Sequence, residues 1–184
     1  GNDGAGADLM SDPIRLLLAD DQALVRGALA ALLDLEPDLE VVAQVGRGDE
    51  VIDAARDSDA QVCLLDIEMP GANGIEAAAA IRTQLPGVRS LIVTTFGRPG
   101  YLRRAIDAGA SGFVVKDTPA AELADAVRRV HAGLRVVDPM LATESLTSGE
   151  NPLTVRETDV LRAALSGATV ATIAATVHLS AGTV

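Results

Sequence analysis

Short apolar runs recur along the first two thirds of the chain and alternate with longer stretches of mixed character. Most of the runs are rich in β-branched residues and lack a regular polar face, which is typical of strands that are covered on both sides. We therefore predict a strand at each run. The predicted strands lie at 14–19, 39–45, 61–66, 89–95 and 112–116.

The stretches between these runs have helical length and place apolar residues three and four positions apart. In the last stretch, Thr118 and Pro119 predict an N-cap followed by a proline in the first helical position. Five strand–helix units in succession predict an α/β domain with a doubly wound, five-stranded parallel sheet and helices on both faces. The predicted helices lie at 22–35, 48–58, 74–85, 99–109 and 118–133.

The pattern divides the chain into four parts. We expect a flexible leader over 1–12, the α/β domain over 13–134, and a linker over 135–151, where no period is sustained. The remaining residues, 152–184, have a helical pattern and predict a small all-α segment.

The overall composition excludes several classes of protein. The chain has 184 residues, is 48% hydrophobic and carries a formal net charge of −11, so a basic surface for general nucleic-acid binding is not expected. Its single cysteine, Cys63, excludes an intrachain disulfide and is compatible with the reducing cytoplasm. No apolar run is long enough to predict a membrane span. We expect a cytoplasmic protein without membrane contact.

Polar residues stand at the carboxyl ends of four of the five predicted strands, the edge where parallel sheets bind ligands. Carboxylates that meet there would repel one another unless a cation joined them. Mg²⁺ fits this need, because it is bound by oxygen ligands and usually accompanies phosphate. The strand-end residues are Asp20, Asp21, Asp66, Thr94, Thr95 and Lys116.

A carboxylate at such a site can act as a nucleophile toward phosphorus, while a hydroxyl and an ammonium bind the other phosphoryl oxygens. Lys116 is the only lysine among fifteen lysine and arginine residues. A compact ammonium on a flexible stem can reach a single phosphoryl oxygen, which a planar guanidinium does less well. The pattern therefore favours phosphoryl chemistry at this edge.

The polar strand-end residues belong to four longer segments, LLLADDQALVRGAL, LLDIEMPGANG, LIVTTF and GASGFVVKD. Together these segments resemble the receiver domain of two-component response regulators, over about residues 14–133. The resemblance implies a flavodoxin-like fold with Asp66 as the phosphoacceptor. It also implies that Asp20 and Asp21 hold Mg²⁺ together with Asp66. Such a protein is a phosphoacceptor with at most slow self-dephosphorylation rather than an enzyme.

The same resemblance implies a conformational switch. Thr94 would move onto the phosphoryl group, Lys116 would pair with that group, and Phe113 would be the switch aromatic that repacks. Thr94 is preferred over Thr95 because its spacing to Asp66 and Lys116 matches the family. The implied partners are a sensor histidine kinase and a second copy of the chain, bound through the receiver helices.

The last part of the chain contains LTVRETDVL at 153–161, Gly167, Ile173–Ala174 and LSAGTV at 179–184. Together these residues resemble the start of a LuxR-type helix-turn-helix of the NarL/FixJ class. In such modules the second helix of the motif enters the major groove of DNA. Residues 152–184 would lack most of this recognition helix, so DNA binding and transcriptional control are expected of a full-length parent.

Two other functions are compatible with parts of the pattern. A phosphohydrolase of the haloacid-dehalogenase type also uses a strand-end aspartate, Mg²⁺, threonine and lysine. Its signature separates two aspartates by one residue after the first strand, whereas Asp20 and Asp21 are adjacent and Asp66 follows a later strand. An interaction-only module, in which the receiver responds and 152–184 reads no DNA, is the other alternative.

A short glycine motif also suggests a nucleotide site. Gly46-Arg47-Gly48 follows a predicted strand and opens a predicted helix, which is the place of a dinucleotide-binding loop. Val51 occupies the position of the third glycine. An ordinary turn is therefore the better interpretation.

Overall fold

The computed structural model describes residues 12–95, 100–139 and 142. Almost the whole of the predicted leader, most of the predicted linker and all of 152–184 lie outside these residues. The predictions made for those segments, including the partial helix-turn-helix, stay predictions.

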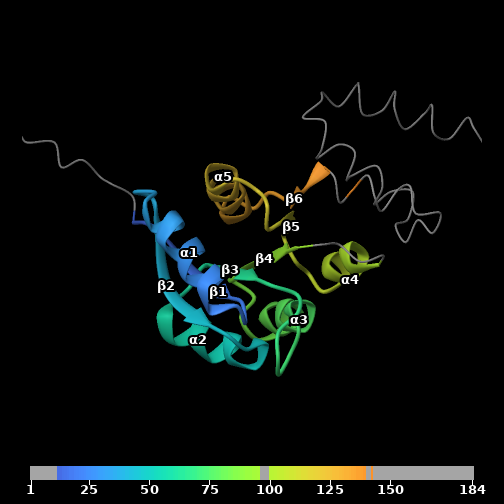
Figure 1. Ribbon diagram of the computed structural model, residues 1–184. Helices are drawn as coiled ribbons and strands as arrows, with labels where there is room; N and C mark the ends of the chain where they lie inside the picture. Colours follow the sequence, from blue (N-terminus) through green and yellow to red (C-terminus); the bar gives the residue numbers. More distant parts are fainter. Residues whose placement is uncertain (1–11, 96–99, 140–141, 143–184) are drawn as a thin grey trace, which may run out of the picture.

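The described residues form one parallel sheet with the strand order β2-β1-β3-β4-β5-β6 (Figure 1). The order reverses at β1 and β3, as expected of a doubly wound sheet of the flavodoxin type. The strands are β1 (Ile14–Ala19), β2 (Leu39–Val45), β3 (Val62–Leu65), β4 (Arg89–Thr94), β5 (Gly112–Val115) and β6 (Val136–Val137).

Helices cover both faces of the sheet, and each face has its own apolar core. One core joins α1 and α5 to the sheet, and the other joins α2, α3 and α4 to its opposite face (Figure 1). This arrangement confirms the predicted α/β class. The helices are α1 (Ala23–Asp34), the 3₁₀ turn η1 (Gly48–Glu50), α2 (Val51–Ser58), α3 (Gly74–Gln84), α4 (Tyr101–Asp107) and α5 (Ala120–His131).

The sheet has six strands, so the prediction of five was wrong by one. β6 falls inside the stretch 135–151 that was predicted to be a linker. It pairs in parallel with the start of β5, and the Val136 amide donates to the Ser111 carbonyl. Two residues are too few to show a hydrophobic period, which is why the sequence pattern did not reveal this strand.

The start of α5 also differs from the prediction. Pro119 is extended, with φ −54° and ψ 143°, and occupies the N-cap position, so the helix begins at Ala120. The Pro119 carbonyl accepts a hydrogen bond from the Leu123 amide. Proline carries no side-chain acceptor, so the N-cap residue of this helix makes no side-chain hydrogen bond. Because Pro119 is itself extended, the helical residues begin only at Ala120, and Thr118 lies one residue before the N-cap position.

The register of the strands aligns their carboxyl ends at one edge. Ala19 of β1 lies beside Leu65 of β3, and Thr94 of β4 lies beside Val115 of β5. The residues that follow these strand ends are therefore neighbours in space. Among the described helices, none is both long enough and apolar enough to cross a membrane.

Candidate functional site

Three carboxylates meet at the carboxyl edge of the sheet. Asp20 and Asp21 follow β1, and Asp66 follows β3. One oxygen of each lies within 4.8 Å of the others. Asp20 and Asp66 are buried, whereas Asp21 is exposed. The structure thus brings together the three residues that the sequence proposed as metal ligands.

Asp20 is held through four of its atoms. Its amide donates to the Val45 carbonyl at the end of β2, and its carbonyl accepts from Nη1 of Arg26 at 2.6 Å. Its carboxylate accepts from the Gln22 amide through Oδ1, at 2.9 Å, and pairs with Lys116 through Oδ2. The Asp20 carboxylate therefore has a defined direction before any ion binds.

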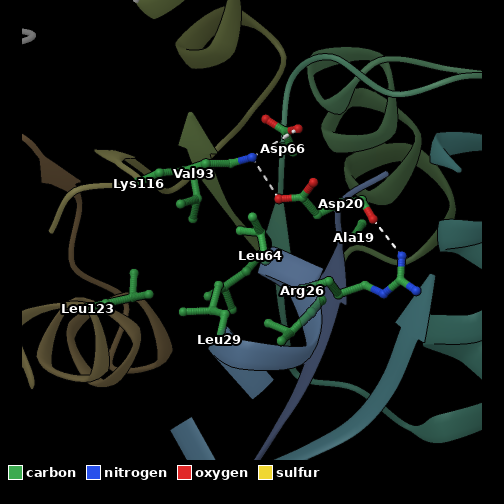
Figure 2. Close-up of a pocket in the computed structure, with 11 residues that line it drawn as sticks. Ala19, Asp20, Arg26, Leu29, Leu64, Asp66, Val93, Lys116 and Leu123 are labelled. Carbon is green, nitrogen blue, oxygen red and sulfur yellow. Dashed lines mark hydrogen bonds and ion pairs between the residues drawn. The ribbon is translucent and has the colours of Figure 1, made fainter. Parts of the chain in front are cut away.

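Lys116 extends from the end of β5 into the acidic cluster (Figure 2). Its Nζ lies 2.7 Å from Oδ2 of Asp20 and 3.3 Å from Oδ2 of Asp66. Burial acts to lower the pKa of Lys116, but the hydrogen bond to Asp20 and the charges of both aspartates together raise it. The ammonium therefore stays charged and lies between two carboxylates.

Asp66 lies in a buried position that disfavours its charged form. Burial raises its pKa to about 6, the charge of Lys116 opposes this rise, and the charge of Asp20 adds to it. Oδ1 of Asp66 accepts from the Ile67 amide at 2.9 Å, while Oδ2 faces Lys116. One oxygen of this carboxylate is thus held by the backbone, and the other points toward the cationic group.

Gly74 allows the start of α3 to lie close to the backbone of Asp66. A Cβ at Gly74 would collide with the Asp66 carbonyl oxygen, and the Gly74 amide donates to the Ile67 carbonyl at 2.8 Å. The first turn of α3 can therefore pack directly against the chain that carries Asp66. Asn73 caps this helix by accepting from the Glu76 amide at 2.8 Å.

Thr94 and Thr95 both line a hollow of about 300 Å³ next to the carboxylates. Thr94 is buried at the end of β4, whereas Thr95 is exposed. Asp66 and Lys116 line the same hollow, as do Asp21 and Glu68. Both threonines are thus near the acidic cluster, and they differ in burial.

Phe113, the predicted switch aromatic, lies on β5 with only 2% of its surface exposed. It belongs to the core on the α2, α3 and α4 face, where Leu102 and Ala105 of α4 are also buried. Its ring is therefore a core residue in this structure, on the strand that leads to Lys116.

The donor set fits a hard divalent cation. Three carboxylates contribute more negative charge than the single ammonium of Lys116 can neutralise. Carboxylate oxygens are the ligands that Mg²⁺ prefers, and Mg²⁺ usually keeps several waters beside one or two such ligands. Asp20, Asp21 and Asp66 are the residues that would hold it.

Sequence reasoning did not single out Arg26, although this residue contacts the backbone of Asp20. A signal was available, because Arg26 is the only charged residue between Ala23 and Leu33, a stretch of α1 that otherwise contains only Ala, Leu, Val and Gly. Gly46 lies next to it, since a Cβ there would be 3.2 Å from Nη1 of Arg26. Gly46 therefore leaves room for the guanidinium. This steric requirement explains a glycine at the first position of the Gly-Arg-Gly segment.

Comparison with known proteins gives consistent matches. A family model described as the response regulator receiver domain matches residues 16–128. Over 171 residues the chain is 43% identical to the transcriptional regulatory protein DesR of Bacillus subtilis (strain 168), covering 93% of this chain and 84% of DesR. Over 177 residues it is 41% identical to the response regulator RamR of Streptomyces coelicolor (strain ATCC BAA-471 / A3(2) / M145), covering 95% and 86% of the two chains.

A solved structure agrees with these matches. The crystal structure of a two-component response regulator of the LuxR family from Aurantimonas sp. SI85-9A1 superposes with a TM-score of 0.70 at 32% identity. The superposition covers 75% of this chain and 99% of that one.

Proposed function

This chain belongs to the response regulator family, with its receiver domain over residues 16–128, and from that membership we propose that it is a phosphorylation-dependent switch whose phosphoacceptor is Asp66. The observation that carries the proposal is the position of Asp66. Its carboxylate lies between two further carboxylates and the ammonium of Lys116, which is 3.3 Å away.

In the proposed reaction, a carboxylate oxygen of Asp66 attacks the phosphorus of a phosphodonor. The new bond joins this oxygen to phosphorus, and the bond between phosphorus and the donor breaks with its electron pair leaving on the donor. Mg²⁺ held by Asp20, Asp21 and Asp66 would supply positive charge to the phosphoryl oxygens. Lys116 supplies a further positive charge beside Oδ2 of Asp66.

The buried hydroxyl of Thr94 and the buried ring of Phe113 support a conformational response. Thr94 lines the hollow beside Asp66 and can hydrogen-bond a phosphoryl oxygen there. Phe113 is the second residue of β5, and β5 pairs with β4, the strand that ends in Thr94. A movement of Thr94 can therefore affect Phe113 through the paired strands. The expected result is a changed surface around α4 and β5.

The proposed partners are a sensor histidine kinase and a second copy of the chain. Exposed leucines on and just after α1 support an interface through the receiver helices, because Leu24 is 88% exposed and Leu35 78% exposed. The proposed output is transcriptional control through DNA binding in the cytoplasm, in line with the similarity to the transcriptional regulatory protein DesR. We infer no catalytic turnover beyond slow loss of the phosphoryl group from Asp66.

Mass spectrometry after incubation with acetyl phosphate and Mg²⁺ tests the proposal. The wild-type chain should gain one phosphoryl group, and Asp66→Asn should gain none. Asp53→Asn is the matched control, because Asp53 is an exposed α2 aspartate that pairs only with Arg56 among the described residues. Equal labelling of Asp66→Asn and the wild-type chain would contradict the assignment.

The proposed switch needs a second measurement. The oligomeric state with and without beryllofluoride should change in the wild-type chain and stay unchanged in Thr94→Val. Thr95→Val is the control, since this neighbouring threonine is exposed. A loss of the response in Thr95→Val with a normal response in Thr94→Val would reverse the assignment of the two residues.

A further inference from the structure

Arg26 extends from the first turns of α1 to the main chain at the end of β1. Its Nη1 donates to the Asp20 carbonyl oxygen at 2.6 Å, while Lys116 contacts the Asp20 carboxylate from the other side (Figure 2). Asp20 is therefore held between two cationic groups, one on its side chain and one on its backbone.

The Asp20 carbonyl is part of the peptide that joins Asp20 to Asp21. Because a peptide unit is planar, a hydrogen bond that fixes this carbonyl also fixes the direction of the bond leading to the Asp21 Cα. Within the part of the chain that the structure describes, the Asp21 carboxylate makes no hydrogen bond or ion pair of its own. The direction of Asp21 therefore depends on its backbone.

The surroundings of the guanidinium indicate that it is held in place. Gly46, directly after β2, lies so close that a Cβ would be 3.2 Å from Nη1. Nε of Arg26 is buried and has no hydrogen-bond partner among the described residues. Burying a charged donor without a partner is unfavourable, so the interaction with Asp20 has to compensate for it.

We propose that Arg26 is a positioning residue for the metal site, which fixes the Asp20–Asp21 peptide so that the Asp21 carboxylate faces Asp20 and Asp66. The proposal rests on the proposed function, since it assigns Asp21 to the Mg²⁺ site. Arg26 does not contact the ion. It acts on the site through the backbone of the residues that bind the ion.

Arg26 could affect Mg²⁺ binding in two ways, and they predict opposite changes in Mg²⁺ affinity when Arg26 is removed. If Arg26 acted only as a nearby positive charge, its removal would strengthen the binding of a cation. If it positions the Asp20–Asp21 peptide, its removal should weaken Mg²⁺ binding by about tenfold or more, as is usual when a residue that orients metal ligands is lost. The sign of the change therefore separates the two explanations.

Isothermal titration with Mg²⁺ of wild type, Arg26→Met and Gly46→Val makes this measurement. Arg26→Met should raise the Kd about tenfold. Gly46→Val leaves Arg26 intact but places a side chain against its guanidinium, so it should also raise the Kd. Arg56→Met is the matched control, because it removes an exposed α2 guanidinium and should leave the Kd unchanged. A Kd for Arg26→Met that is equal to or below that of the wild-type chain would overturn the proposal.

A second readout needs no metal. In the metal-free chain, ¹⁵N relaxation should show the Asp21 amide becoming more mobile on the picosecond to nanosecond timescale in Arg26→Met, while amides of α2 and β3 keep their wild-type values. An Asp21 amide as rigid in the variant as in wild type would overturn the proposal whatever the Mg²⁺ result. A wild-type chain that binds no Mg²⁺ would instead count against the proposed function, and the relaxation data would still judge Arg26.

Discussion

Lys116 and Asp20 form the shortest ion pair of the acidic cluster, with Nζ 2.7 Å from Oδ2. The distance from the same ammonium to Asp66 is longer, at 3.3 Å. In this structure Lys116 thus pairs most closely with a proposed metal ligand rather than with the proposed phosphoacceptor. Binding of a cation by Asp20 would compete with this pair.

Lys116→Met should therefore bind Mg²⁺ several-fold more tightly than the wild-type chain, because the variant removes a positive charge from beside the three carboxylates. Calorimetric titration measures the change. Arg103→Met serves as a control, since Arg103 pairs with Asp107 on α4. An unchanged or weaker affinity in Lys116→Met would show that the ammonium does not oppose metal binding.

Asp66→Asn should stabilise the metal-free protein. Three carboxylates share the edge with one ammonium, and Asp66 is buried, so removing its charge relieves repulsion and desolvation. We expect the free energy of unfolding to rise by about 1–2 kcal/mol at neutral pH, which is within the range that single stabilising substitutions commonly give. Urea denaturation without Mg²⁺ measures it, with Asp53→Asn as control. A destabilised Asp66→Asn variant would contradict the prediction.

Arg128→Met should weaken the attachment of α5 to the segment between α1 and β2. Arg128 bonds both carboxylate oxygens of Asp38, at 2.7 and 2.9 Å, and also bonds Glu36. Because these groups are partly exposed, we expect a loss of only about 1 kcal/mol, and less in high salt. Thermal unfolding at low and high ionic strength measures this loss, and equal stability of both proteins at low salt would argue against it.

The contribution of Arg128 to the free energy of unfolding should also depend on pH. The hydrogen bond from Arg128 holds the pKa of Asp38 below its ordinary value of 3.8. A carboxyl group whose pKa is lowered by folding stabilises the protein above the unfolded pKa, and this stabilisation is lost as the pH falls through the folded value. The difference in free energy of unfolding between wild type and Arg128→Met should thus be constant near neutral pH and shrink below about pH 3.8. A difference that grows in acid would contradict this assignment.

Cys63 should be unreactive in the native protein. It is fully buried on β3, and burial raises the pKa of its thiol to about 12. The reactive thiolate is therefore scarce and inaccessible at pH 8. Mass spectrometry should find no maleimide adduct in native buffer and one adduct in urea. Rapid native labelling without loss of structure would contradict the described burial.

The sequence by itself determined most of the sheet and the location of the site. Buried strands can be recognised in the local sequence, because a strand covered on both faces needs a continuous apolar run. Parallel strands place their carboxyl ends at one edge, so Asp20, Asp66 and Lys116 could be predicted to meet there from their positions after such runs. The predicted convergence is present, with Lys116 within 3.3 Å of both aspartates.

Other features were decided only by the tertiary structure. The contact between Arg26 and the Asp20 carbonyl depends on how α1 lies against the end of β1 and on the space left by Gly46. The pairing of Arg128 with Asp38 joins residues 90 positions apart through the packing of α5 beside α1. A hydrophobic pattern records which positions are buried. It does not record which polar group a long side chain meets, because that depends on the distances and angles between packed elements.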